Sequence, residues 1–563
     1  MKVALLDSNH VALSIARSLR NKGIAVDVLH LTGPSIADWS HCVDRVVRLP
    51  SATDDMAAHA DALLRHLQQT LYDLLIPVSD AAVVVCRHLR KEISGLVTIA
   101  MSDEATLAIS SDKLATARLA ESLGVPVPNG QLIASGEEDR VGDLVTTYPC
   151  YLKPSRSVVV LNNRLVRFSV RRADNLMDVK RYCYSTANSN PVIVQQQILG
   201  KGAGVYLIAE HGKVLAMACQ YRLHEPQKGG PGSYRVSAPV PEQLAEYTRR
   251  LIAAVGYHGV AMVEFKGDPV AQRWHLMEIN NRFWGSLPLT LSSGLDMPYW
   301  LVQLSFDKKT AIPAHLQVLP MRQRDLKRDL GWLTLRLISG PARLSRLLNY
   351  MGDLKYLAKG EEKIDYLDWR DPLPFLVDWV FLLKRLRRKT RPRVERLVHG
   401  LSYRRKKHAL LATARIKLKS ARPNILFVCY GNICRSPFAE WYLKDRYHYQ
   451  NVKSAGVHPV TNRLSPPELQ EVANTRFDID LSEHRSTLLD DELVSWADMV
   501  IAMNYNNLAD LKCRNLGGAA VLLGSFADVG PIRDPYGKST SIIEDVLNKI
   551  ALSVDKMMAD QLP

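Results

Sequence analysis

The run Val428-Cys429-Tyr430-Gly431-Asn432-Ile433-Cys434-Arg435-Ser436-Pro437 is the strongest indication of the fold of the C-terminal part of the chain. It follows the apolar run 424–428, which reads as a buried β-strand, and it precedes a helix expected to begin near Pro437. A loop between a strand and a helix N-terminus turns several backbone N–H groups toward one point. Because the helix dipole adds partial positive charge there, such a loop favours an anion.

Two side chains of this loop, Cys429 and Arg435, have the spacing Cys-x5-Arg. A thiol is a weak nucleophile at neutral pH until it ionises, and the helix N-terminus together with the guanidinium favours the thiolate. The loop amides and the planar guanidinium can bind the oxygens of a phosphoryl group. The pattern predicts thiolate attack on a phosphate ester through a cysteinyl-phosphate intermediate. A purely structural buried cysteine is the alternative, and Asn432, Ser436 and Pro437 favour the catalytic interpretation.

These residues resemble the phosphate loop of the low-molecular-weight protein tyrosine phosphatases, and the resemblance extends over 423–563. It implies a doubly wound parallel-sheet domain. It also implies that Cys429 is the nucleophile and that Arg435 binds the phosphate. Asp534, in the run Asp534-Pro535-Tyr536, would protonate the leaving oxygen and later activate water.

The same resemblance gives expectations for the rest of the loop. Asn432 would hold its strained turn, Ser436 would donate a hydrogen bond to the thiolate, and Cys434 would be a second cysteine able to form a protective disulfide. The implied substrate is a phosphotyrosine protein or a phosphorylated small molecule. Tyr430 can supply an aromatic ring, whereas Ile433 stands where phosphoarginine-selective relatives have Thr. The complete predicted phosphate loop consists of Tyr430, Gly431, Asn432, Ile433, Cys434 and Ser436.

Length and composition indicate a globular protein of several domains. The chain has 563 residues, of which 47% are hydrophobic and 23% charged, and this length exceeds what one core accommodates. Its eight cysteines include no CxxC pair, so neither a zinc finger nor a disulfide framework is expected, and a cytoplasmic location is predicted. The first residues predict a β-strand and not a signal peptide, and no apolar run reaches the length of a membrane span.

The net charge of +16 is concentrated in one segment. Residues 384–422 contain sixteen Lys and Arg and a single acid, Glu395, directly after the apolar run 375–383. This pairing suits a helix on an anionic membrane surface, which would make the protein peripheral at the inner face of the membrane. A solvated basic linker helix is the alternative. Nucleic acid is the least favoured partner, since no recognised binding module accompanies the segment.

Residues 1–110 alternate short apolar runs with helical stretches, which is the pattern of a doubly wound α/β domain. The predicted strands are 3–6, 25–29 and 74–77, with a helix over 12–19 between the first two. No GxGxxG turn follows the first strand, so a dinucleotide cofactor is not indicated.

Residues 111–305 carry an ordered series of polar residues. Glu278 and Asn280 are two apart on a predicted strand and so face one side, and a neighbouring strand with Glu264 would bring three oxygen ligands together, as Mg²⁺ prefers. Arg282 would extend the same edge and could neutralise a transferred phosphoryl group. Lys113 opens a predicted helix and Lys153 ends a predicted strand.

This series resembles the ATP-grasp superfamily, in the branch similar to the carbamoyl-phosphate synthetase large subunit and the carboxylate–amine ligases. The implied fold is a Rossmann-like domain followed by α+β ATP-binding subdomains. Lys113 and Lys153 would bind ATP, and Mg²⁺ (with Mn²⁺ as an alternative) would be held by the three oxygen ligands. Arg282 would be catalytic. The adenine pocket would be lined by Gln195, Gln196, Gln197 and Ile198.

The two resemblances together predict a bifunctional multidomain α/β enzyme. The ligase half would phosphorylate a small carboxylate to an acyl phosphate that an amine attacks, and the two active sites would act in series. The alternative is a membrane-associated regulatory tyrosine phosphatase with a non-catalytic ATP-binding module. The predicted domains are 1–110 (α/β), 111–305 (ATP-grasp), 306–380 (helical extension), 381–422 (basic linker) and 423–563 (phosphatase).

Overall fold

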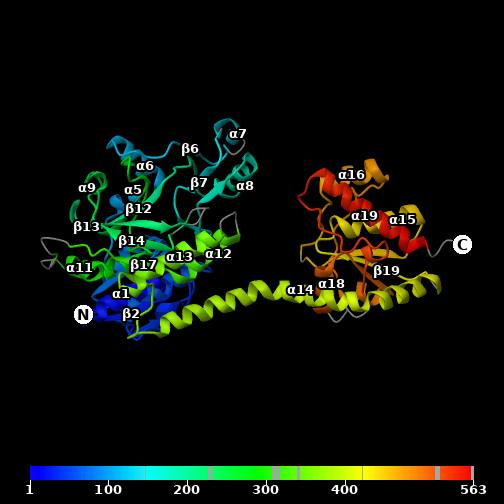
Figure 1. Ribbon diagram of the computed structural model, residues 1–563, viewed down its shortest axis with the longest axis horizontal. Helices are drawn as coiled ribbons and strands as arrows, with labels where there is room; N and C mark the ends of the chain where they lie inside the picture. Colours follow the sequence, from blue (N-terminus) through cyan, green and yellow to red (C-terminus); the bar gives the residue numbers. More distant parts are fainter. Residues whose placement is uncertain are drawn as a thin grey trace. The chain divides into compact units, whose positions relative to one another are not determined.

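The computed structural model describes residues 1–563 except 138–139, 146, 226–229, 231, 307–311, 313–316, 339–342, 421, 459, 514–519 and 560–563. Side chains are also left undescribed at 143–144, 338, 343–344, 346, 386, 388–400, 420 and 512–513. The chain forms two compact units, Met1–Phe381 and Leu382–Pro563. Figure 1 shows each of them with its own sheets and helices.

The N-terminal unit begins with a parallel five-stranded sheet in the order β3-β2-β1-β4-β5. The predicted α/β pattern is confirmed here, because β2 and β4 have the predicted bounds and β1 begins one residue earlier. Helix α1 begins after Asn9, whose side chain accepts hydrogen bonds from the Val11 and Ala12 amides. The elements are β1 (Lys2–Leu6), α1 (His10–Arg20), β2 (Ala25–Leu29), η1 (Ile36–Trp39), β3 (Arg45–Val47), α2 (Met56–Gln69), β4 (Leu74–Pro77), α3 (Asp80–His88), α4 (Arg90–Ser94), β5 (Thr98–Ile99) and α5 (Glu104–Ser110).

A second, antiparallel sheet follows in the order β10-β7-β11-β6, with the separate hairpin β8–β9 beside it in sequence. Lys113 is the first residue of α6, which Asp112 caps, and Lys153 lies near the end of β7, as predicted. The elements are α6 (Lys113–Ser122), β6 (Gly130–Ile133), α7 (Val141–Leu144), β7 (Cys150–Pro154), β8 (Val158–Leu161), β9 (Arg164–Arg167), β10 (Arg171–Ala173), α8 (Leu176–Thr186) and β11 (Val192–Gln196).

The largest sheet has seven strands in the order β16-β15-β12-β13-β14-β17-β18. Its register places Glu264 of β15 opposite Glu278 of β16, beside an irregularity between Glu264 and Phe265. This pairing confirms that the strand with Glu264 neighbours the strand with Glu278 and Asn280. The elements are β12 (Lys201–Glu210), β13 (Lys213–His224), β14 (Tyr234–Ala238), α9 (Glu242–Ala254), β15 (Gly259–Asp268), β16 (Arg273–Asn280), α10 (Leu287–Ser292), α11 (Met297–Leu304), β17 (Arg322–Arg324) and β18 (Glu362–Ile364).

Helices α12 (Leu326–Ile338) and α13 (Arg343–Ala358) form a hairpin between β17 and β18. The chain then enters α14, a single helix over Leu373–Ser420. The predicted border between the helical extension and the basic linker, at residue 380, therefore falls inside one continuous helix. Among the residues that the structure describes, no helix is both long and apolar enough to cross a membrane.

The C-terminal unit is built on a parallel sheet in the order β20-β19-β21-β22. Strand β19 ends at Cys429 and α15 begins at Arg435, so the expected strand–loop–helix joint is present, with the helix starting two residues earlier than predicted. The elements are β19 (Ile425–Cys429), α15 (Arg435–Tyr447), β20 (Val452–Gly456), α16 (Pro467–Phe477), α17 (Asp491–Trp496), β21 (Met499–Ala502), α18 (Tyr505–Cys513), β22 (Val521–Leu522), η3 (Leu523–Ser525) and α19 (Thr540–Met558).

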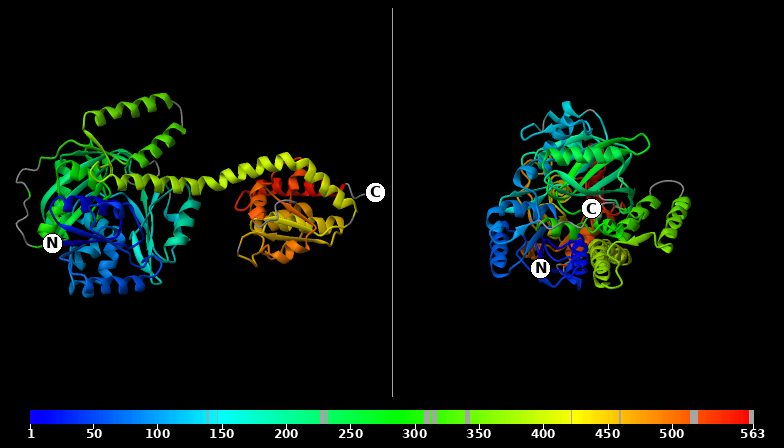
Figure 2. Two further views of the ribbon diagram at one scale, coloured as in Figure 1. Left: turned by 90° about the horizontal axis from the view of Figure 1, so that it is seen from below. Right: turned by 90° about the vertical axis from the view of Figure 1, so that its left-hand side faces the viewer.

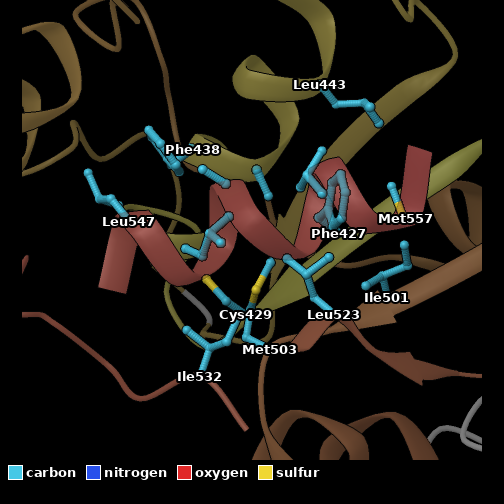
Figure 3. Close-up of a cluster of buried hydrophobic side chains, with 14 of the residues drawn as sticks. Phe427, Cys429, Phe438, Leu443, Ile501, Met503, Leu523, Ile532, Leu547 and Met557 are labelled. Carbon is cyan, nitrogen blue, oxygen red and sulfur yellow. The ribbon is translucent and has the colours of Figure 1, made fainter. Parts of the chain in front are cut away.

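The last turns of α14 belong to the core of this unit. The apolar cluster that contains Phe427 and Cys429 of β19 also contains three buried residues of α14: Leu411, Ala414 and Leu418. Figure 3 shows the centre of this cluster, where Cys429 lies among side chains of the sheet and of α19. The Tyr403 hydroxyl adds a polar anchor, since it pairs with Ser525 Oγ at 3.0 Å and accepts from the Leu522 amide at 2.9 Å.

Candidate active sites

The thiol of Cys429 lies at the carboxyl end of β19 and is 2% exposed. Two donors point at its sulfur: the Asn432 amide, at 3.2 Å from Sγ, and the Ser436 hydroxyl, at 3.1 Å. Both are hydrogen-bond donors to a sulfur acceptor, so they stabilise the thiolate in preference to the thiol. The structure thus brings the predicted nucleophile and the predicted thiolate donor Ser436 together.

The side chain of Asn432 stabilises the turn of the phosphate loop. Its φ of 50° is left-handed, which Asn tolerates better than most residues, and its side chain is fully buried. Nδ2 donates to Ser436 Oγ at 3.0 Å and to Ser454 Oγ at 2.8 Å, while Oδ1 accepts from the Thr487 amide at 2.8 Å. A Cβ at Gly456 would lie 2.9 Å from the Asn432 nitrogen, so this glycine leaves room for the loop.

Arg435 joins the phosphate loop to the segment that carries Asp534. The guanidinium is 1% exposed, its Nη2 lies 2.8 Å from Asp534 Oδ2, and its Nη1 donates to the Ile532 carbonyl at 3.3 Å. Its Nε has no hydrogen-bond partner among the described residues. A buried guanidinium with one open N–H, beside a half-exposed carboxylate, is the arrangement that a bound phosphoryl group and a proton donor require.

The rim of this site is aromatic and basic. Tyr430 is 53% exposed and stands edge-on to His458, with ring centroids 5.2 Å apart, and Tyr536 is 63% exposed. Arg463, which the sequence did not single out, donates from Nη2 to the Gly431 carbonyl at 2.8 Å. Cys434, within the loop, is buried, and burial, followed by the charge of Asp534, raises the pKa of its thiol well above the usual value.

A second candidate site is a cavity of about 420 Å³ in the N-terminal unit. Most residues that the sequence predicted for ATP and metal line it: Lys153, Gln195, Gln196, Ile198, Glu264, Glu278, Asn280 and Arg282. Gln197 is not among the described lining residues. Lys113 lines a neighbouring cavity of about 60 Å³, which shares Glu278 and Asn280 with the larger one.

The three predicted metal ligands converge across β15 and β16. Glu264 Oε1 accepts a hydrogen bond from Asn280 Nδ2 at 3.3 Å, and Glu264 and Glu278 are register partners. Burial raises the pKa of Glu278, but the charges of Lys113 and Lys153 outweigh it and hold that pKa below its usual value. Among the described residues, no three His, Cys, Asp or Glu side chains gather as a metal site, and the set here has two Glu and one Asn.

The two lysines approach these carboxylates from different elements. Lys113 Nζ lies 3.5 Å from Glu278 Oε2 and donates to Ser157 Oγ at 2.7 Å. Lys153 Nζ lies 3.8 Å from the sulfur of Met277, and burial lowers the pKa of Lys153 to about 8. The cavity therefore combines acidic and basic side chains within reach of one another.

Arg282 is positioned by a residue for which the sequence suggested no role. Its Nε and Nη2 each lie 2.9 Å from a carboxylate oxygen of Asp80, and Nη2 also donates to Asn280 Oδ1 at 3.2 Å. Burial raises the pKa of Asp80, but Arg282 outweighs it and keeps that pKa low. The available signal was the position of Asp80 at the polar turn directly after β4.

Sequence reasoning also missed a basic side of the cavity. Arg222 pairs with Glu264, and Arg235, 4% exposed, pairs with Asp365 while its Nε has no partner among the described residues. Gln220 lies two residues before Arg222 on β13, and its Oε1 is likewise buried and unpartnered. Polar residues at i and i+2 on an otherwise apolar strand were the signal that could have found this side.

Comparison with known proteins agrees with the geometry of the site around Cys429 and Arg435. Residues 424–562 match the family model described as low molecular weight phosphotyrosine protein phosphatase. The probable low molecular weight protein-tyrosine-phosphatase EpsP of Ralstonia nicotianae is 35% identical over 133 residues, which is 23% of this chain and 90% of that protein. The low molecular weight protein-tyrosine-phosphatase Etp of Escherichia coli is 34% identical over 125 residues, 22% of this chain and 84% of that protein.

The loop, its buried thiol and its paired guanidinium define a cysteine-dependent phosphatase. Through its C-terminal unit the chain belongs to the low molecular weight protein-tyrosine-phosphatase family. Its sequence relatives quoted above cover that unit only.

The N-terminal unit carries an ATP-grasp domain. Residues 188–325 match the family model described as ATP-grasp in the biosynthetic pathway with Ter operon. Among solved structures, an L-amino acid ligase from Bacillus licheniformis aligns at 16% identity with a TM-score of 0.45, covering 56% of this chain and 77% of that chain. The two family-model matches confirm the predicted resemblances to the ATP-grasp superfamily and to the phosphatases, and with them the predicted α/β fold class, so the chain joins an ATP-grasp domain to a phosphatase domain.

Proposed function

We propose that the C-terminal unit hydrolyses phosphate monoesters with Cys429 as nucleophile. The carrying observation is the sulfur with its two donors beside the Arg435–Asp534 pair. The thiolate attacks phosphorus, the ester P–O bond breaks, and Asp534 gives its proton to the leaving oxygen. Asp534 then takes a proton from water, which attacks the cysteinyl phosphate and releases inorganic phosphate and the thiolate.

The proposed substrate class is an aromatic phosphate, in first place phosphotyrosine. Two exposed tyrosine rings, Tyr430 and Tyr536, flank the nucleophile and the acid in sequence, and such rings can stack on an aryl ester. A phosphorylated small molecule, the other predicted substrate, would gain less from these rings unless it carried an aromatic group.

For the N-terminal unit the proposed function is ATP-dependent ligation of a carboxylate to an amine. The residues present fit a divalent cation, because Glu264, Glu278 and Asn280 offer hard oxygen donors and Glu278 is held ionised. Bound Mg-ATP would supply the transferable phosphoryl group. Lys113 and Lys153 would bind its phosphates, with the Gln195–Ile198 stretch along the adenine, and Arg282, fixed by Asp80, would neutralise charge on the transferred group.

The basic side of the same cavity is the proposed place for the acceptor carboxylate. Arg235 has a buried N–H without a partner among the described residues, and Arg328 lines the same cavity. A carboxylate there would satisfy the open donor, and Gln220 Oε1 could accept from a hydroxyl or ammonium group of the substrate.

A second candidate function is a regulatory phosphatase whose ATP-grasp domain binds nucleotide without turning it over. The ion pair between Arg222 and Glu264 favours it, because a guanidinium already neutralises one of the proposed metal ligands. ATP-dependent ligation would require the ion pair between Arg222 and Glu264 to break when the metal binds.

The test uses the full chain as wild type, Cys429→Ser and Glu278→Gln, each incubated with Mg-ATP and a small-metabolite extract. ADP release and new conjugates are followed by mass spectrometry. ADP formation that Glu278→Gln abolishes would support the ligase, and a conjugate that stays phosphorylated only with Cys429→Ser would place the two sites in series. Measurable ATP binding without ADP formation above background would favour the regulatory alternative.

A further inference from the structure

Arg222 lies near the end of β13 and lines the cavity of about 420 Å³ in the N-terminal unit. In both views of Figure 2 the green strands of the seven-stranded sheet, to which β13 belongs, lie next to the dark blue strands of the first sheet. Ala216 and Ala218 of β13 pack in one apolar cluster with Val3 and Leu5 of that first sheet. Because side chains alternate along a strand, Arg222 is on the same face of β13 as these two alanines, at its cavity end.

The guanidinium of Arg222 pairs with one of the proposed metal ligands. Its Nη2 lies 2.5 Å from Glu264 Oε2, and the other oxygen of that carboxylate, Oε1, accepts from Asn280 Nδ2 at 3.3 Å. A divalent cation on Glu264 would therefore lie close to the guanidinium, and two cations at such a distance repel strongly in a cavity that excludes water. Glu264 can bind the metal only when Arg222 moves to another anion.

The other carboxylate near Arg222 does not meet this need. Arg222 Nη1 lies 3.9 Å from Glu225 Oε1, which also accepts from the Gly202 amide at 3.2 Å. Lys266 Nζ lies 3.7 Å from the second oxygen of Glu225. This carboxylate is already shared with another cation, so it compensates the charge of Arg222 only in part.

The stem of Arg222 is closely packed, and its side chain is only 17% exposed. A Cβ at Gly202 would lie 2.9 Å from Arg222 Cδ, and a Cβ at Gly232 would lie 3.0 Å from Arg222 Cγ. This packing keeps the guanidinium within the cavity when it leaves Glu264. A buried cation without an anionic partner is strongly disfavoured, so the released guanidinium requires an anion that enters the cavity together with the metal.

We propose that Arg222 exchanges one anion for another and thereby controls metal binding. In the free protein it pairs with Glu264, and it passes to a phosphate oxygen of the nucleotide when Glu264 binds a divalent cation. Charge is balanced, since Glu264 exchanges one cation for another and Arg222 one anion for another. The site therefore rejects a divalent cation alone and accepts it together with a polyphosphate. This inference rests on the proposed ATP and metal site.

The test follows two affinities of the full chain and its variants. Electron paramagnetic resonance measures the binding of Mn²⁺ alone, and calorimetry measures the binding of a non-hydrolysable ATP analogue in the presence of Mn²⁺. Arg222→Gln should bind Mn²⁺ alone about tenfold more tightly than wild type, because Glu264 has lost its partner. The same variant should bind the analogue about tenfold more weakly, because a phosphate contact is lost. A purely structural role of Arg222 would weaken both kinds of binding.

Two further variants are the controls. Arg235→Gln removes another buried arginine of the same cavity, whose carboxylate partner, Asp365, is not among the proposed metal ligands. Its affinity for Mn²⁺ alone should equal that of wild type. Adding Glu278→Gln to Arg222→Gln should abolish the gain in Mn²⁺ affinity, because a second proposed ligand is then lost.

Glu264→Gln examines the exchange from the other side and does not depend on the folding of Arg222→Gln. It frees Arg222 without metal, so in EDTA it should bind the analogue about tenfold more tightly than wild type does. The inference is overturned if the analogue binds but Arg222→Gln and wild type bind Mn²⁺ alone equally well, or if Arg235→Gln gains as much as Arg222→Gln. If neither wild type nor any variant binds the analogue, the proposed ATP site is wrong, and the inference fails with it.

Discussion

Arg435 and Asp534 are 99 residues apart in sequence, yet Arg435 Nη2 and Asp534 Oδ2 lie 2.8 Å from one another. The guanidinium is almost completely buried, whereas the carboxylate is half exposed. The group proposed to bind phosphate and the group proposed to donate the proton are thus held in one place by two different segments, the start of α15 and the loop before α19.

The first prediction concerns the carboxylate of this pair. Asp534→Asn keeps the size of the side chain but removes the proton that the leaving oxygen needs. We expect kcat for phosphotyrosine to fall by about 10²–10⁴-fold, and by much less for an ester with a good leaving group. Steady-state kinetics on the two substrates measure the difference.

Asp545→Asn is the matched control for that prediction. Asp545 also pairs with an arginine, Arg533, at 2.8 Å, but it lies on α19 and its pair is solvent-exposed. Its replacement should leave kcat unchanged. An equal loss of activity in both variants would contradict a specific acid role for Asp534.

The second prediction concerns Asn432. Asn432→Ala removes three buried side-chain hydrogen bonds and places alanine, which tolerates the left-handed region less well than asparagine, at a φ of 50°. We expect a loss of at least about 1–3 kcal/mol of unfolding free energy, together with loss of phosphatase activity, because the Asn432 amide no longer points at the sulfur. Chemical denaturation followed by phosphatase activity measures both effects.

Asn432→Gly separates the two causes. Glycine adopts the left-handed backbone freely, so this variant should be about 1–2 kcal/mol more stable than Asn432→Ala while still lacking the hydrogen bonds. If both variants were as stable as wild type, the side chain of Asn432 would not brace the loop.

The third prediction is a pH dependence at Lys153. Since burial lowers its pKa from 10.5 to about 8, the folded protein releases this proton before the unfolded chain does. Nucleotide affinity should therefore fall as the pH rises through about 8. The contribution to folding has the opposite sign: between about pH 8 and 10.5 the unfolded state binds more protons, so stability rises with pH in that window.

Calorimetric titration with a non-hydrolysable ATP analogue below and above pH 8 measures the first effect. Below pH 8, Lys153→Gln should bind the ATP analogue more weakly than wild type does. The affinity of this variant should not fall further as the pH rises through 8. Lys266→Gln is the comparison, because Lys266 lines the same cavity on β15 and its charge helps to lower the pKa of Lys153; this variant should keep the pH dependence and move its midpoint upward. A pH-independent wild-type affinity would contradict the assignment of Lys153 to the phosphates.

The fourth prediction concerns α14. Leu418 is 2% exposed in the apolar core of the phosphatase unit, so Leu418→Ala should cost about 2–5 kcal/mol in the unfolding of that unit. Ile416, two residues earlier, is 67% exposed, and Ile416→Ala should change stability by less than about 0.5 kcal/mol. Thermal inactivation of phosphatase activity in the full chain measures both, and equal effects would argue against packing of α14 in this core.

Patterns among neighbouring residues are enough to predict the local chemistry of both halves. Cys429, Arg435 and Ser436 lie within one loop, and an apolar strand before it and a helix after it are enough to place them, because neighbours in sequence are neighbours in space. In the same way, the alternation of a β-strand put Glu278 and Asn280 on one face. The families, the α/β class and the main strands could all be predicted from such short-range patterns.

Long-range packing decided the rest. Three contacts join segments that are distant along the chain: Asp80 with Arg282, Arg463 with the phosphate loop, and Arg222 with Glu264. No periodic pattern in the sequence connects the two partners of such a contact. The packing of residues 403–418 in the core of the phosphatase unit could not be predicted for a further reason. Its basic residues dominate the composition, whereas the few buried apolar residues among them are recognised only when the sheet they pack against is present.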